Sequence, residues 1–209
     1  IRVEIPVLLP AAAPVVITYR AAFADAIEPG QVVPNQATLD YASAPNLGRD
    51  LGDDAEASVR GEFGLALTKE IIGTSLPETG SGYFDPALPD LAAGETVTYR
   101  VTATLSEGTQ RLVITDTLPP GLVAEQVRVA SVGTGISAGA PVIIIDGSRI
   151  TVDFGTVVNT GDNTAGDQIA IEVVARLNAT QPAGAVLVNN AEAAVTAPTD
   201  PSAPGGTLI

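Results

Sequence analysis

The chain has 209 residues, enough for one large or two small domains, and its hydrophobic content of 45% excludes bulk disorder. It has no Cys and no His, which excludes disulfides, zinc sites built on those residues, and Cys–His or Ser–His–Asp catalysis. The net charge of −14 argues against nucleic acid or anionic lipid as partners, and no apolar run reaches the roughly 18 residues of a membrane span.

Apolar and polar side chains alternate with a period of two through much of the chain, which is typical of half-buried β-strands. Turn signals such as Glu107-Gly108 and Asp146-Gly147 separate the segments. In chain order the predicted strands are 63–72, 96–105, 111–117, 122–132, 141–145, 149–154, 168–177 and 185–195. Short strands at this spacing predict an all-β fold of immunoglobulin-like antiparallel β-sandwich domains in tandem.

An internal repeat sets the predicted domain boundaries. The segment 15–23 matches 169–177, and 33–39 matches 187–193, both at an offset of 154 residues; 1–5 also resembles 150–154. We therefore interpret residues 1–62 as the C-terminal half of a preceding repeat and 63–196 as a complete repeat. Residues 197–209, rich in Pro, Gly, Ser and Asp, are predicted to be a linker. Such arrays are more typical of a spacer than of an enzyme.

The single lysine lies on a predicted apolar face. Along the first strand of the complete repeat, Lys69 alternates onto the same side as Phe63, Leu65, Leu67 and Ile71. An ammonium group that points into a core is costly unless it is paired or deprotonated. The position of Lys69 therefore requires a partner or a chemical role.

Two further polar side chains are predicted to point inward. Asp116 shares a face with Leu112, Ile114 and Leu118, and Asn189, unlike Asn190, shares the apolar face of the last strand. An amine, an acid and a carboxamide thus occupy inward positions on three strands.

Three segments of the complete repeat carry a family resemblance. The stretch 94–105, the element Asp116-Thr-Leu-Pro-Pro-Gly-Leu122, and Val188-Asn-Asn-Ala191 resemble isopeptide-forming immunoglobulin-like repeat domains of bacterial fimbrial and adhesin surface proteins. In such domains a Lys on the first strand joins an Asn on the last, assisted by an Asp or Glu. The resemblance, which covers roughly 63–196, implies a crosslink between Lys69 and Asn189 with Asp116 as the catalytic acid.

Elementary chemistry is consistent with this implication. Apolar burial favours a neutral, nucleophilic lysine and a protonated aspartic acid that can hydrogen-bond the carboxamide oxygen. Two alternatives stay open from the sequence: a buried Lys69–Asp116 ion pair with Asn189 as a bystander, and a lysine that extends to solvent. The counterpart of Asn189 in the first half-repeat is Asn35, which we expect to keep its carboxamide within this chain.

The remaining acidic residues are interpreted as possible calcium ligands or as surface acids. No cofactor is expected, and calcium is the one metal with candidate ligands, namely Asp50, Asp53 and Asp54 in one acidic loop and Asp162 and Asp167 in another. Plain solvated turns are the alternative for both loops. Glu95 and Asp153 are predicted to be solvated surface acids.

These features predict an extracellular stalk or spacer segment of a bacterial cell-surface adhesin or fimbrial protein. Its partners would be neighbouring repeats of the same polypeptide, with any host or surface ligand contacted by other domains. Its one reaction would be a single self-crosslinking event, so we expect no turnover enzyme. The alternative is a ligand-binding adhesin module that uses the long 73–94 connection as its contact surface.

Overall fold

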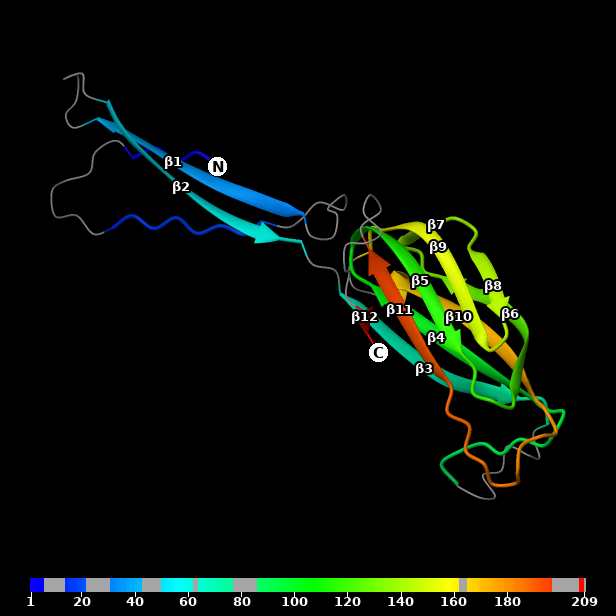
Figure 1. Ribbon diagram of the computed structural model, residues 1–209. Helices are drawn as coiled ribbons and strands as arrows, with labels where there is room; N and C mark the ends of the chain where they lie inside the picture. Colours follow the sequence, from blue (N-terminus) through cyan, green and yellow to red (C-terminus); the bar gives the residue numbers. More distant parts are fainter. Residues whose placement is uncertain are drawn as a thin grey trace.

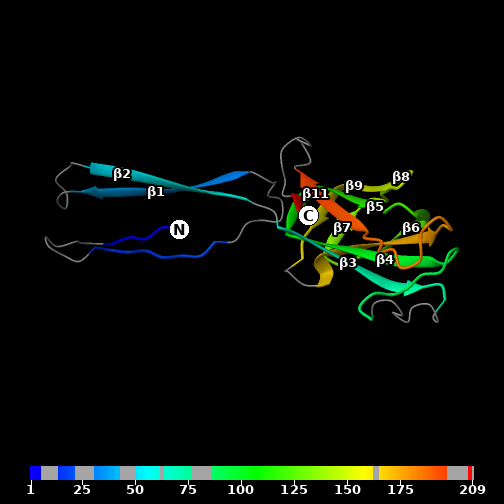
Figure 2. The ribbon, with the colours of Figure 1, turned by 60° about the horizontal axis from the view of Figure 1, so that its bottom comes forward.

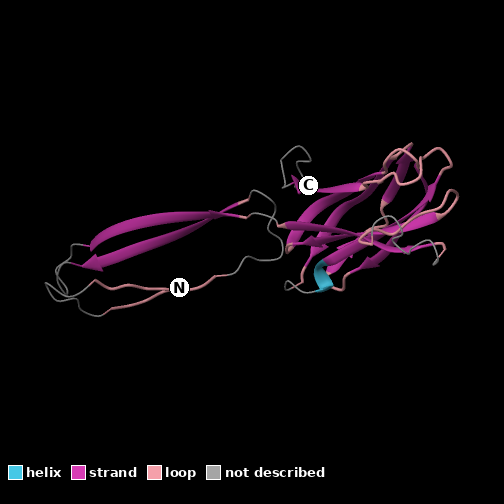
Figure 3. Ribbon diagram, turned by 90° about the horizontal axis from the view of Figure 1, so that it is seen from below, coloured by secondary structure: helices cyan, strands magenta, loops and turns pink. Residues whose placement is uncertain are grey.

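The structure is a computed structural model that describes residues 1–5, 14–21, 31–42, 50–61, 64–76, 86–161, 165–196 and 207–208. The described chain is almost entirely strand and loop, and its helical content is a short 3-10 turn at Ala165–Asp167 (Figure 3). The strands, in chain order, are β1 Val32–Ala42, β2 Asp50–Arg60, β3 Leu65–Thr74, β4 Thr96–Leu105, β5 Gly108–Thr117, β6 Leu122–Val132, β7 Ile136–Ala138, β8 Val142–Asp146, β9 Arg149–Asn159, β10 Gln168–Leu177, β11 Asn190–Thr196 and β12 Thr207–Leu208.

Two antiparallel sheets form the main body of the molecule (Figure 1). One has the order β3-β4-β10-β6, and the other has the order β12-β11-β5-β9-β7, with β8 also paired to β9. The predicted immunoglobulin-like antiparallel β-sandwich is therefore confirmed. The first strand of the sandwich, β3, lies in one sheet, and its last long strand, β11, lies in the other. A bond between these two strands therefore joins the two layers.

The core lies between the two sheets and follows the alternation seen in the sequence. On β4 every second side chain is buried and the intervening ones are only partly covered, so one face of the strand meets the opposite sheet. Aliphatic residues dominate the core, and its fully buried members include Val97, Val101, Leu112, Ile114, Ile150, Ile169, Ile171, Val173 and Val195.

Three predicted strands, β4, β6 and β10, have the expected bounds, and the other strands of the sandwich differ from the prediction at one or both ends. β9 continues to Asn159 because Gly155 adopts a φ of +63°, which glycine reaches without a Cβ penalty, so that a bulge replaces a strand end. β11 begins at Asn190 and not at 185, and the short strand β7 was not predicted.

The N-terminal part of the chain forms no sandwich of its own among the described residues. β1 and β2 pair with each other in a two-stranded antiparallel sheet, and Figure 2 shows this sheet to one side of the sandwich. Residues 14–21 have no regular structure, although the repeat aligns them with β10. At the other end Thr207–Leu208 pairs with β11, within the predicted linker. The tandem arrangement itself stays a prediction.

A search of the described residues for a membrane-crossing helix, one both long and apolar enough, finds none.

The central position of β10 predicts a large effect of core truncation. Ile171→Ala removes a fully buried side chain from the middle of the four-stranded sheet and is expected to lower the free energy of unfolding by about 2–5 kcal/mol. Val123→Ala truncates an exposed residue of β6 and is expected to change it by less than about 0.5 kcal/mol. Urea unfolding followed by circular dichroism measures both, and equal effects would contradict the assigned core.

Candidate functional site

Lys69 lies on β3 and points into the sandwich, as the alternation predicts. Its side chain is 14% exposed, and its Nζ lies 5.0 Å from the centroid of the Tyr99 ring on β4. On the same face Leu65 is buried and Leu67 is half-buried, whereas Phe63 lies outside the described residues. The amine is therefore enclosed by apolar and aromatic groups, which remove most of its hydration.

Asp116 reaches the same point from the other sheet. It lies near the end of β5, its side chain is fully buried, and its Oδ1 is 2.6 Å from Lys69 Nζ. On β5 it pairs with Ile150 of β9 on one side and with Ala191 of β11 on the other. The contact between Lys69 and Asp116 therefore crosses the core and connects the two sheets.

Asn189, the residue just before β11, completes the cluster. Its Nδ2 donates to Asp116 Oδ2 over 3.4 Å, so one carboxyl group contacts the amine through one oxygen and the carboxamide through the other. Asn189 Oδ1 is also buried, and it accepts no hydrogen bond from a described residue. Its neighbour Asn190 is exposed. The structure thus brings together the three side chains that the sequence singled out.

Burial moves the protonation equilibria of the pair toward the uncharged forms. Desolvation lowers the pKa of Lys69, and the neighbouring Asp116 offsets part of this effect. Desolvation raises the pKa of Asp116, and the hydrogen bond and charge of Lys69, with the hydrogen bonds from Asn189 and the Thr117 backbone, offset part of this effect. Burial, together with the charge of Asp116, raises the pKa of Tyr99 to about 12. Burial therefore shifts both pKa values in the direction of a neutral amine and a protonated acid.

This geometry is incompatible with one sequence-based alternative. A lysine that extends to solvent would not lie 2.6 Å from a fully buried carboxyl oxygen, so that interpretation is wrong. The contact itself is common to an ion pair and to the reactants of a condensation. The two remaining readings differ in where the shared proton lies and in whether Asn189 reacts.

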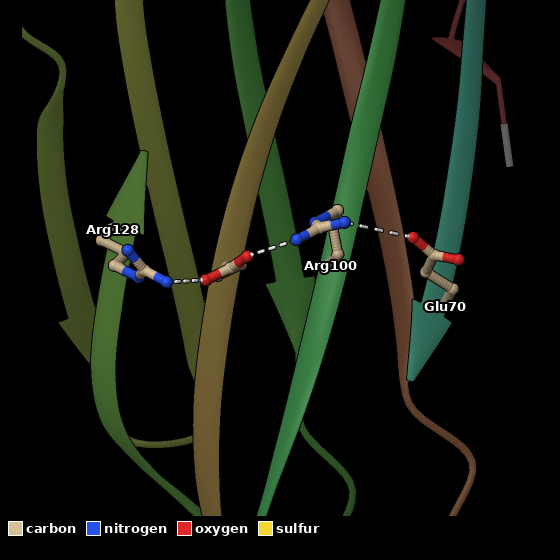
Figure 4. A network of polar contacts seen from close by, with 4 residues as sticks. Glu70, Arg100 and Arg128 are labelled. Carbon is tan, nitrogen blue, oxygen red and sulfur yellow. Dashed lines mark hydrogen bonds and ion pairs between the residues drawn. The ribbon is translucent and has the colours of Figure 1, made fainter. Parts of the chain in front are cut away.

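A second polar cluster, on the outer face of the four-stranded sheet, was missed in the sequence. Arg128, Glu172, Arg100 and Glu70 form one row across β6, β10, β4 and β3, in which each member faces the next (Figure 4). Glu172 is buried and accepts hydrogen bonds from both arginines, which hold its pKa below the ordinary value. The only signal was outward polar residues on neighbouring strands, and strand neighbours are not visible in one sequence.

Glu95 is also not the solvated acid that its turn position predicts. Its side chain is buried, and its two carboxylate oxygens each accept a backbone N–H at 2.9 Å, one from Leu76 and one from Ala92. Glu95 therefore ties together the two ends of the long connection between β3 and β4. Residues 77–85 of that connection, the contact surface of the alternative function, lie outside the described residues.

Among the described residues the calcium candidates do not come together in one site. Asp53 and Asp54 lie within strand β2 and not in the predicted loop, and successive strand residues point to opposite faces. Asp50 begins the same strand, Asp167 is buried in the 3-10 turn, and Asp162 lies outside the described residues. Among the described residues no group of three or more acidic side chains is arranged to hold a metal ion.

Comparison with known proteins shows distant similarity to solved structures. No family model and no curated protein matches the chain. The major pilin GBS80 of Streptococcus agalactiae, a C-terminal fragment, is 15% identical with a TM-score of 0.40 over 55% of this chain and 47% of that one. The T6 backbone pilin of Streptococcus pyogenes is 14% identical with a TM-score of 0.42 over 73% and 33%. The collagen binding domain of RspB from Erysipelothrix rhusiopathiae is 11% identical with a TM-score of 0.33 over 88% and 53%. The matched region is thus about half or less of each of these solved chains.

The row on the outer face predicts a pH-dependent contribution to stability. Since Arg100 and Arg128 lower the pKa of Glu172, its ionised form stabilises the fold above about pH 4.5, and this contribution is lost as the pH falls through the lowered pKa. Glu172→Gln is expected to lower the urea midpoint at pH 7 and to approach wild type in acid. Glu192→Gln, which changes an exposed acid, is the control. A deficit for Glu172→Gln that is independent of pH would contradict the assignment.

Proposed function

We propose that the 63–196 unit is a structural stalk or spacer segment of a bacterial surface protein, stabilised by an isopeptide bond between Lys69 and Asn189. The observation that carries this proposal is the contact of one buried carboxyl group, Asp116, with both prospective partners. The sequence resemblance supports it independently, because it assigns the same roles to the same three residues.

The first step is a proton transfer within the pair. Lys69 and Asp116 are desolvated together, and both pKa directions favour movement of a proton from Nζ to the carboxylate. The products are a neutral amine with a free lone pair and a carboxylic acid with a donor. Both are the forms that attack on a carboxamide requires.

The second requirement is a polarised carbonyl. The two ends of a carboxamide have nearly the same shape, so a half-turn of the Asn189 side chain exchanges Oδ1 and Nδ2. Oδ1 then faces Asp116 Oδ2 and accepts the hydrogen bond of the protonated acid. The exchange also gives a partner to an oxygen that is otherwise buried without one.

Condensation then proceeds with Asp116 as proton carrier. Lys69 Nζ attacks Asn189 Cγ, and the negative charge that develops on the oxygen is stabilised by the acid. Asp116 gives its proton to the amide nitrogen and takes one from Nζ, the bond from Cγ to the amide nitrogen breaks, and ammonia leaves. A new amide joins the side chains and Asp116 is regenerated. No turnover follows, because both reactants are consumed.

The bond has a mechanical consequence. It joins β3, the first strand of the sandwich, to Asn189, the residue just before the last long strand, β11, and closes a loop over a sequence separation of 120 positions. Loop-closure entropy alone stabilises a fold by about 5 kcal/mol at this length. Tension applied along the polypeptide passes through the crosslink, and β4 to β10 need not unfold. Resistance to unfolding under tension suits an extracellular stalk that holds the binding domains of a surface protein away from the cell.

Intact mass measurement tests the proposal directly. The full chain is expected to be lighter than its calculated mass by one ammonia, and the Lys69→Ala, Asn189→Ala and Asp116→Ala variants are each expected to have their full calculated mass. Asn190→Ala changes the adjacent but exposed asparagine and should keep the deficit. Circular dichroism shows which variants fold.

Two results would contradict the proposal. A wild-type mass equal to the calculated one would leave Lys69 and Asp116 as an unreacted buried pair. A deficit that persists in folded Lys69→Ala would place the reaction at another residue.

A further inference from the structure

Strand β8 is a short apolar strand at a free edge of the sandwich. Its five residues, Val142–Asp146, pair with β9, and among the described residues no second strand pairs with β8 (Figure 1). The first four are branched aliphatics, with exposed fractions between 38% and 62%. The strand has neither a lysine nor a bulge, two devices that keep an edge strand from pairing with another chain.

Two of these aliphatic side chains face inward and still lack a cover. Ile143 is opposed by Val152 of β9 and Ile145 by Ile150, and directly opposed residues share one face of the sheet. Val152 and Ile150 are buried in the core, whereas Ile143 and Ile145 are exposed. The opposite sheet therefore covers the inner face as far as β9 and ends short of β8. Both the backbone edge of β8 and its inner apolar face are open to a partner.

We propose that two copies of this chain associate through β8, with the two strands antiparallel about a two-fold axis that passes beside Ile144, perpendicular to the sheet. In a symmetric antiparallel pair each strand donates to the other the same backbone hydrogen bonds that it accepts, so the two free edges satisfy one another. The two sheets then continue as one, with the inner faces of both copies on the same side.

The side chains of β8 complement their own copies in this arrangement. Ile144 opposes Ile144 of the second copy on the outer face, and Ile143 opposes Ile145 of the second copy on the inner face. The uncovered isoleucines therefore cover one another. Asp146, the charged residue of the strand, opposes Val142 of the second copy, so no like charges meet. This match of apolar residues with apolar residues, without opposed charges, favours a second copy over an unrelated chain as the occupant.

The ends of β8 limit the association to a closed dimer. Pro141, just before the strand, has no N–H to donate, and Gly147, just after it, turns the chain with a φ of +59°. The two-fold contact uses the free edge of β8 in both copies and leaves no such edge for a third copy. The inference does not rest on the proposed crosslink, because β9 separates β8 from the strand that carries Asp116.

Sedimentation velocity of the full chain over a range of concentrations tests the proposal. We expect the mass to rise with concentration from that of one chain to that of two and to stop there. Added salt is expected to strengthen the dimer, because each copy has a net charge of −14 and salt screens their mutual repulsion.

Matched lysine variants locate the contact. Ile144→Lys places two like charges opposite each other at the axis and is expected to weaken dimerisation by about tenfold. Val123→Lys changes an exposed valine on β6, the edge strand of the other sheet, and should dimerise like the wild type. Both positions are exposed, and circular dichroism verifies that both variants keep the fold.

A single cysteine reports the register of the two strands. The chain has no Cys, so a disulfide of Ile144→Cys can form only between copies. Because directly opposed side chains lie close enough for a disulfide, we expect Ile144→Cys to form a linked dimer on mild oxidation and Val123→Cys to stay unlinked.

Three results would overturn the proposal. One is a wild-type chain that stays monomeric up to the highest concentration reached, and another is growth beyond two chains. The third is an equal effect of the lysine at positions 144 and 123, which would place the contact elsewhere. Equal disulfide formation by the two cysteine variants, or none by Ile144→Cys, would overturn the register centred on Ile144.

Discussion

The structure depends on the contact between one amine and one carboxyl group in an apolar core. Lys69 comes from one sheet and Asp116 from the other, and each is the main compensation for burying its partner. The same desolvation that makes the pair costly also favours the uncharged forms of both groups, which the proposed condensation requires. Asn189 contacts the second oxygen of Asp116, so the buried pair lies next to a carboxamide with which Lys69 is proposed to condense.

The sequence was most informative where a property depends on alternation along one strand. The inward directions of Lys69, Asp116 and Asn189 follow from a period of two, and no knowledge of neighbours is needed. The row through Glu172 and the buried position of Glu95 depend on which strands and turns become neighbours, so alternation alone assigned them to solvent. The acidic run at Asp53 and Asp54 was misread because its composition is typical of a loop, although pairing with β1 makes it a strand.

The four-stranded sheet is specified from both of its faces. Inside, the aliphatic residues of β4 and β10 meet the opposite sheet; outside, alternating charges from Arg128 to Glu70 cross all four strands at one level. A slip of one residue in any strand would bring apolar groups to the surface and break the charge row at the same time. Register is thereby fixed by two independent sets of contacts.

Glu95 fixes the two ends of the connection between β3 and β4, which makes the length of that connection free to vary. One buried carboxylate holds the backbone at Leu76 and at Ala92, so both ends of this connection are fixed against the start of β4. Lengthening a surface connection adds little entropic cost once its ends are fixed. A peptide inserted between these two fixed ends would therefore leave β3 and β4 in their places, and the length of the connection is free to vary in evolution on the same terms.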